Sequence, residues 1–131
     1  REARALARKE LCYRWTDPLS HGLTRAAIGR AHVLVHPSRL EGGANVIVEA
    51  VTSGTPVIAS RMSGNLGMLG ADYPGYFDAG DAQGLARALC RTLEEPGYLR
   101  TLRSACARRR PLFRPQAEAR AVRNLVASLI L

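Results

Sequence analysis

The stretch "HVLVHPSRLEGGANVIVEAVTSGTPVIAS", residues 32–60, determines the fold. Its first five residues, 32–36, form a largely apolar run that is typical of a strand in a parallel sheet covered on both faces. Residues 45–53 predict a helix, and Gly54 stands where a helix ends in a left-handed residue. A second apolar run, residues 56–60, has its proline at the first position, where a buried strand tolerates it. The order of strand, helix and strand predicts a parallel βαβ unit.

The alternation of strands and helices continues on both sides of this unit, and 131 residues suit one domain. Before it we predict a helix at 2–11, a short strand at 12–15 and a helix at 19–29. After it we predict a glycine-rich loop at 61–75, an edge strand at 76–80, a helix from Asp81 to Leu93, a helix around 99–106 and a last helix at 116–131. The sequence therefore predicts an α/β fold: a Rossmann-like parallel sheet with flanking helices and a helical C-terminal tail.

The net charge of +8 is unevenly distributed along the chain. Residues 1–30 carry seven basic and three acidic side chains, residues 31–80 carry two and four, and residues 81–131 carry ten and four. A nucleic-acid reader more often holds its base-contacting residues within the basic region, and one Trp and two Phe offer few stacking aromatics. We therefore expect no nucleic-acid ligand, and basic flanks that face solvent or an acidic partner.

The composition indicates neither a membrane span nor a metal site. No apolar run approaches the roughly 20 residues that cross a bilayer, and the basic start of the chain lacks the apolar core of a signal peptide. The three cysteines are odd in number and have no metal-type spacing. We expect unpaired thiols, a cytoplasmic protein and no bound metal. Residues 107–111, "ARRRP", are expected to be a solvated helix end, with contact to an acidic membrane surface as the less favoured reading.

Two carboxylates, Glu41 and Glu49, mark the predicted site. Ligands of open α/β sheets bind outside the carboxyl ends of the strands, and the loop at 37–44 follows such an end. The small residues after Glu41 leave amides at a positive helix start, and Glu49 lies about one turn further on, tilted toward that start. Carboxylates accept hydrogen bonds from vicinal hydroxyls. A solvated Glu49 is disfavoured because its helix is otherwise apolar, whereas Glu41 alone fits a plain loop carboxylate equally well.

Residues 36–60, "HPSRLEGGANVIVEAVTSGTPVIAS", resemble the C-terminal, nucleotide-sugar-binding domain of the family 4 glycosyltransferases, which have the two-domain GT-B architecture. The shared pattern is the spaced pair of glutamates, with Gly after the first and Ala after the second, followed by the Gly-x-Pro-Val run at 54–57. The resemblance covers about residues 12–110. It implies that residues 1–131 are a single partial domain, without the N-terminal acceptor domain or the diphosphate-clamping Arg and Lys of the family. We expect such a fragment to be inactive on its own.

The resemblance also implies roles for individual residues. Glu41 would contact donor sugar hydroxyls near the reacting carbon, and Glu49 would hold the ribose hydroxyls. The remaining donor-binding positions are the amides of Gly42, Gly43, Ala44 and Asn45 along the sugar and diphosphate, the segment from Trp15 to Leu19 beside a base that is most often uracil, and Ser60, Arg61 and Gly64 at the far wall. The donor is then a UDP-sugar or related nucleotide-sugar, and no cofactor or metal is implied.

This sequence departs from the family pattern in two places, at 42–44 and at 63–67. After the first glutamate many members have Gly-Phe-Gly, whereas this chain has Gly-Gly-Ala at 42–44. In the later loop the family usually has Gly-Gly-x-x-Glu, whereas this chain has Ser-Gly-Asn-Leu-Gly at 63–67. Within the family, the sequence of residues 41–77 resembles most the selenosugar synthases of selenoneine biosynthesis. This resemblance implies selenophosphate as acceptor. The alternatives are a nucleotide-sugar epimerase or phosphorylase of the same architecture, and a non-catalytic basic module that binds nucleic acid.

Overall fold

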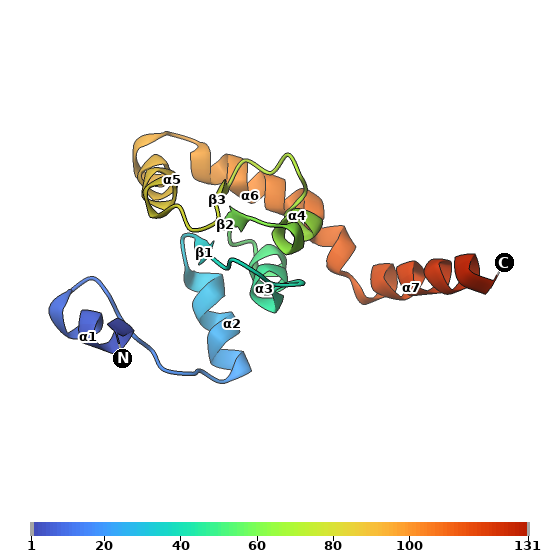
Figure 1. Ribbon diagram of the computed structural model, residues 1–131, viewed down its shortest axis with the longest axis horizontal. Coiled ribbons are helices and arrows are strands. Elements are labelled where there is room, and N and C mark those ends of the chain that lie inside the picture. Colours follow the sequence, from blue (N-terminus) through green and yellow to red (C-terminus); the bar gives the residue numbers. More distant parts are fainter. Residues whose placement is uncertain (1, 131) are drawn as a thin grey trace.

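Three short parallel strands form the sheet at the centre of the computed structural model, which describes residues 2–130 (Figure 1). They are β1 (Leu34–His36), β2 (Val57–Arg61) and β3 (Tyr76–Asp78), in the order β1-β2-β3. In the register of the central strand, His36 lies opposite Ala59, and Ser60 lies opposite Phe77. The predicted parallel sheet is confirmed, and β3 lies at an edge of it as expected, with β1 at the other edge.

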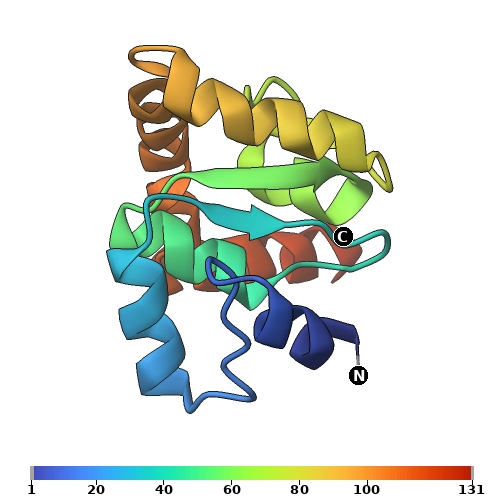
Figure 2. The same cartoon turned by 90° about the vertical axis from the view of Figure 1, so that its left-hand side faces the viewer.

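Helices flank this sheet on both sides. In Figure 2, α2 and α3 lie on one side of the strands and α5 lies on the other. The C-terminal helix extends away from the sheet (Figure 1), as expected of a helical tail. The helices are α1 (Glu2–Lys9), α2 (His21–Arg30), α3 (Asn45–Ser53), α4 (Ser63–Leu69), α5 (Ala82–Glu94), α6 (Tyr98–Arg109), the 3-10 turn η1 (Arg110–Phe113) and α7 (Pro115–Ile130). No helix of the described chain has the length and apolar character needed to span a membrane.

The core lies where α3, β2 and α6 meet. Ile47 and Val51 of α3, Ile58 of β2 and Leu102 of α6 have no exposed surface. Burying each such side chain stabilises the fold by about 1.5–3 kcal/mol. The Tyr73 hydroxyl also lies in this core and donates to the Val57 carbonyl at 2.5 Å. Burial raises the pKa of Tyr73 well above its usual value, so the phenol stays neutral and serves packing.

The C-terminal end of α3 is closed by several independent contacts. Gly54 follows the helix with φ 81° and ψ 14°, the left-handed residue that its position in the sequence predicts. Arg110 Nε donates to the Val51 carbonyl, and Arg103 Nε donates to the Gly54 carbonyl, each at 3.3 Å. Cations at this end of a helix offset its dipole. Two charges of the basic C-terminal flank therefore serve the fold.

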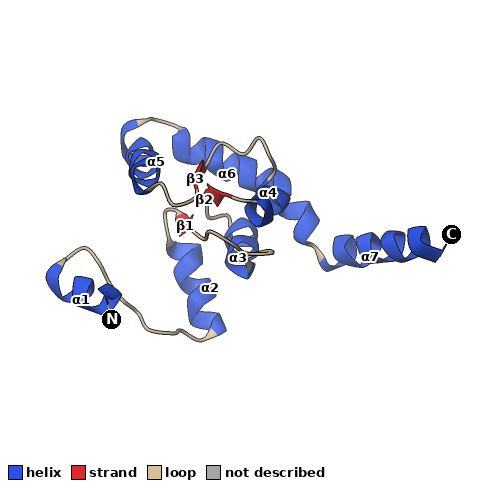
Figure 3. Ribbon diagram, in the orientation of Figure 1, coloured by secondary structure: helices blue, strands red, loops and turns tan. Residues whose placement is uncertain are grey.

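Two predictions about local structure are wrong. Residues 12–15 do not form a strand; they lie in the exposed loop between α1 and α2 (Figure 3), where the described chain offers no neighbouring strand. Residues 61–75 are not a continuous loop, because they contain α4. The glycines at 64 and 67 suggested a loop, but both lie within this helix. The expected cap at Asp81 is confirmed, since its carboxylate accepts a hydrogen bond from the Gly84 amide at 2.9 Å.

We predict that Gly54→Ala destabilises the protein by about 1 kcal/mol or more, because a β-carbon disfavours a left-handed backbone by about 1–2 kcal/mol. The measurement is the free energy of unfolding in urea. Gly22→Ala is the matched control: it lies in α2, with nothing within 4 Å of an added β-carbon. This control should be neutral or stabilising by up to about 1 kcal/mol. Equal stabilities of the two variants would contradict the role given to Gly54.

Candidate functional site

Glu49 has a buried carboxylate that the described residues satisfy only in part. It lies in the second turn of α3, and its side chain is 13% exposed. Its Oε1 lies 3.2 Å from Nδ1 of His21, on the facing helix α2. Its Oε2 is buried and has no hydrogen-bond partner among residues 2–130. A buried carboxylate oxygen without a donor is costly, so a ligand that brings hydroxyl donors fits this position.

A cavity of about 570 Å³ opens beside Glu49, between α2, α3 and the segment that leads into α7. His21 and Arg25 of α2 line one side of it, and Asn45 and Glu49 of α3 line the other. Phe113, from η1, contributes an apolar wall. A pocket with an apolar wall and a few convergent polar groups is the usual form of a small-molecule site.

Glu41 lies on the loop between β1 and α3, outside the lining of that cavity. Its side chain is 39% exposed, and its Oε2 lies 2.9 Å from Nε2 of His36, the last residue of β1. The structure therefore places both predicted carboxylates around the start of α3, but in different surroundings. Glu49 is held in a helix, whereas Glu41 stands at the carboxyl end of a strand.

The start of α3 carries no acidic residue and no side-chain cap. Ala44, the N-cap residue, is buried, and a β-carbon on Gly42 would meet nothing within 4 Å. In the part of the chain that the structure describes, the amides of Gly42, Gly43 and Ala44 donate no hydrogen bond to another residue. Backbone amides without a partner at a positive helix end are a typical anion-binding feature.

Ser60 and Gly64 contact the backbone of the loop that carries Glu41. Ser60 is fully buried, and its hydroxyl donates to the Ser38 carbonyl at the start of the loop. The side-chain amide of Asn65 donates in turn to the Ser60 carbonyl at 2.8 Å. A β-carbon on Gly64 would lie 2.2 Å from the Glu41 carbonyl oxygen. In this arrangement both residues set the position of the loop, whereas the sequence places them in the wall of the donor site.

Arg61 and Trp15 are not brought together with the two carboxylates. The Arg61 guanidinium lies over the Tyr76 ring, 4.9 Å from its centre, and borders a different cavity of about 400 Å³. Burial raises the pKa of Tyr76 to about 12. Trp15 is 43% exposed on the loop before α2, where its indole donates to Asp17 Oδ1 at 3.0 Å. Neither residue lines the Glu49 cavity.

Comparison with known proteins identifies the family. The model of the family "Glycosyl transferases group 1" matches residues 12–110. The chain belongs to this family. A search of curated proteins found no match. Among 35 matching chains of solved structures is the sucrose-phosphate synthase of Thermosynechococcus elongatus, with 29% sequence identity and a TM-score of 0.78. The match covers 97% of this chain and 33% of the synthase chain, so this group 1 transferase chain spans about a third of that protein.

This match agrees with the fold. The parallel sheet with flanking helices is the Rossmann-like half of a GT-B glycosyltransferase, followed by a helical tail. The broad resemblance seen in residues 36–60 is therefore confirmed. The family match does not distinguish the branch of selenosugar synthases from other members of the family. It also does not identify the donor or the acceptor.

His21, His36, Arg25 and Phe113 were not among the predicted site residues. A signal was available for His36, because it ends a strand and therefore stands at the edge that holds the ligand in this fold. His21 comes near Glu49 because α2 packs against α3. Phe113 had no such signal, because its place beside α3 depends on the packing of a distant segment.

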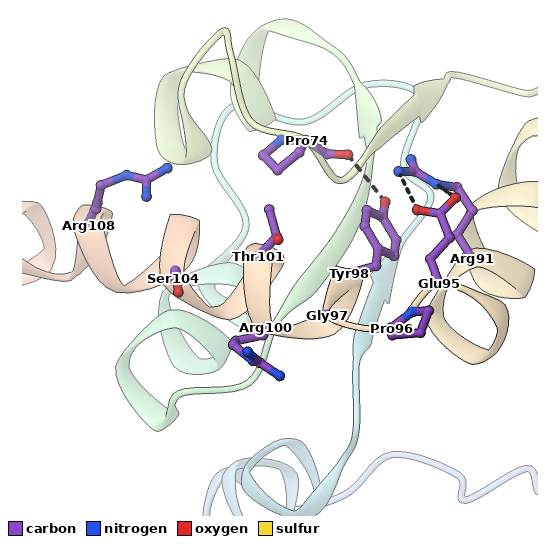
Figure 4. A pocket seen from close by; sticks show the side chains of 10 residues that line it. All are labelled: Pro74, Arg91, Glu95, Pro96, Gly97, Tyr98, Arg100, Thr101, Ser104 and Arg108. Atoms are coloured by element: carbon purple, nitrogen blue, oxygen red, sulfur yellow. Dashed lines mark hydrogen bonds and ion pairs between the residues drawn. The ribbon is translucent and has the colours of Figure 1, made fainter.

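A third cavity, of about 520 Å³, lies between the loop at Pro74 and the start of α6 (Figure 4). In it Arg91 forms two hydrogen bonds with Glu95, at 2.7 and 3.0 Å, and its guanidinium stacks on Tyr98. Arg91 holds the pKa of the Glu95 carboxyl below its usual range. None of the predicted site residues lines this cavity, and among residues 2–130 no cluster of metal-ligating side chains was found.

We predict that Gly64→Ala destabilises this transferase domain by about 1–3 kcal/mol, because the added methyl meets the backbone of the Glu41 loop, which must shift. Gly67→Ala, in the same helix, is the control: nothing lies within 4 Å of its β-carbon. The difference in urea midpoint between the two variants measures the effect. If both unfold at the same urea concentration, α4 does not support the loop as described.

Proposed function

We propose that this chain is the donor-binding domain of a glycosyltransferase, and that the enzyme transfers a sugar from a UDP-sugar or related nucleotide-sugar to an acceptor. The family match and the similarity to a solved sucrose-phosphate synthase support sugar transfer. The observation that carries the assignment of the site is the unpartnered Oε2 of Glu49. The two hydroxyls of a ribose supply two donors, one for each oxygen of a carboxylate.

The start of α3 is proposed to hold the donor's diphosphate. The positive end of α3 is preceded by three amides that donate no hydrogen bond in the described chain, those of Gly42, Gly43 and Ala44. No acidic residue in the first turn of α3 opposes an anion. Negative charge grows on the diphosphate as the sugar leaves, so fixed donors at this place stabilise the transition state more than the ground state. Glu41 is proposed to orient sugar hydroxyls near the reacting carbon. We propose no cofactor and no metal for this step.

A second domain of the same enzyme is proposed as the partner of this chain. The tail helix α7 has a stripe of large apolar side chains that are 48–77% exposed: Val122, Leu125, Val126 and Leu129. An exposed stripe of this kind is typical of a protein interface. We propose that the acceptor-binding domain covers it.

The exposed thiols Cys12 and Cys90 fit a reducing compartment, so we propose the cytoplasm.

The test of donor binding is Glu49→Gln in the intact transferase, with UDP titrated by calorimetry. Gln keeps the size of the side chain but removes the charge that binds hydroxyl donors, so UDP affinity should fall about tenfold to hundredfold. Glu94→Gln, at the exposed end of α5 and outside the Glu49 cavity, is the control and should bind UDP normally. Unchanged affinity in Glu49→Gln would remove the basis for the site.

The same experiment separates the rival functions. A short oligonucleotide that binds with a steep salt dependence, and equally well to Glu49→Gln, would favour the nucleic-acid module. Three arginines of the basic flank donate to backbone carbonyls of the protein itself, which argues against that module: Arg103, Arg109 and Arg110. An epimerase would return a changed nucleotide-sugar without an acceptor, and a phosphorylase would require inorganic phosphate.

We propose selenophosphate as the acceptor, on the resemblance of residues 41–77 to selenosugar synthases. We expect the intact enzyme to consume a UDP-sugar in the presence of selenophosphate, with release of UDP and formation of a selenium-bearing sugar detected by mass spectrometry. Inorganic phosphate is the control and should give no such product. Transfer to a sugar acceptor in place of selenophosphate would leave the transferase and the donor site intact, but it would reject this branch.

A further inference from the structure

The contact between His36 and Glu41 extends the proposed function to a residue outside the donor-binding set. His36 is the last residue of β1 and is 8% exposed. Its Nε2 lies 2.9 Å from Oε2 of Glu41, but the two atoms are not aligned as a hydrogen bond, so Nε2 is buried without a partner in the described chain. A buried polar nitrogen beside a carboxylate needs an explanation.

The short distance is favourable for one arrangement of the imidazole proton. A ring nitrogen without a proton presents a lone pair, which a carboxylate oxygen repels at this range. The contact is therefore favourable only when Nε2 carries a proton and can donate to Glu41. Groups that act together in a site are often poorly aligned without ligand and tighten when it binds.

His36 is the fixed member of the pair. It pairs with Ala59 in the sheet, and the Ser60 hydroxyl lies 3.4 Å from its carbonyl oxygen. Glu41 lies on a loop, is 39% exposed, and is followed by two glycines. Among the ion pairs of residues 2–130, Glu41 has no second partner. Arg39 of the same loop lies against Gly80, after β3.

We propose that His36 is a positioning residue: its Nε2–H holds Oε2 of Glu41 and leaves Oε1 to accept a hydrogen bond from a hydroxyl of the donor sugar. This inference rests on the proposed function of the site. It assigns His36 to the orientation of the transferred sugar, whereas Glu49 serves the nucleotide. Removal of His36 therefore impairs the chemical step and leaves nucleotide affinity unchanged.

The test compares His36→Ala and His36→Gln in the intact transferase. The amide nitrogen of Gln reaches about the position of Nε2, so it can still donate to Glu41. We expect kcat of His36→Ala to fall about tenfold to hundredfold, the usual result of misplacing a reacting group, while KM and UDP affinity change less than twofold. His36→Gln should recover most of kcat. His32→Ala, which replaces an exposed histidine before β1, should leave all values unchanged.

A double-mutant cycle with Glu41→Gln gives a second readout. If His36 acts through Glu41, then His36→Ala should cost little more in the Glu41→Gln background. Additive losses, equal losses for Ala and Gln at position 36, or loss of UDP affinity together with kcat would each overturn the proposal. An unmodified enzyme that fails to bind UDP would reject the proposed function itself. An active enzyme with normal kcat in His36→Ala would reject only the role of His36.

Discussion

The left-handed turn at Gly54 is the constraint on which the rest of the structure depends. It reverses the chain between α3 and β2, so that the helix packs back along the parallel strands and its start returns to their carboxyl edge. At the C-terminal end of α3, Arg110 donates to the Val51 carbonyl and Arg103 donates to the Gly54 carbonyl. With its C-terminal end closed by protein groups, the helix presents its free amides and Glu49 at a defined place. The binding chemistry at one end of α3 thus rests on the capping at the other.

Much of this arrangement is local and could be predicted from the sequence. The apolar runs, Gly54 and the Asp81 cap each act within a few residues, and the resulting elements are confirmed. The errors occurred where the outcome depends on distant partners. Residues 12–15 have β-type side chains but no strand beside them in the described chain. Gly64 of α4 is explained by its close packing against the Glu41 loop, which is distant in the sequence. Phe113 and Ser60 acquire their places only through packing between segments.

The positive charge of the chain has a partly structural explanation. The sequence suggested that the basic C-terminal flank meets solvent or an acidic partner, but Arg103, Arg109 and Arg110 donate hydrogen bonds to backbone carbonyls of the protein itself. Arg109 Nε donates to the Met68 carbonyl at 2.8 Å, near the C-terminal end of α4. Together the three arginines close the ends of the two helices that carry and support the site. Three of the ten basic residues at 81–131 therefore compensate helix dipoles, which weakens the argument for nucleic acid.

The two glutamates differ in a way that suits different tasks. Glu49 is held in a helix with one oxygen near His21 and the other free, which suits tight and uniform binding of the part of the donor that does not react. Glu41 stands on a loop with an exposed side, and His36 lies beside only one of its oxygens. Uniform binding lowers KM, whereas only contacts that strengthen in the transition state raise kcat. On the proposed function, a rigid carboxylate binds the nucleotide and an adjustable one binds the sugar, which is the part that moves during transfer.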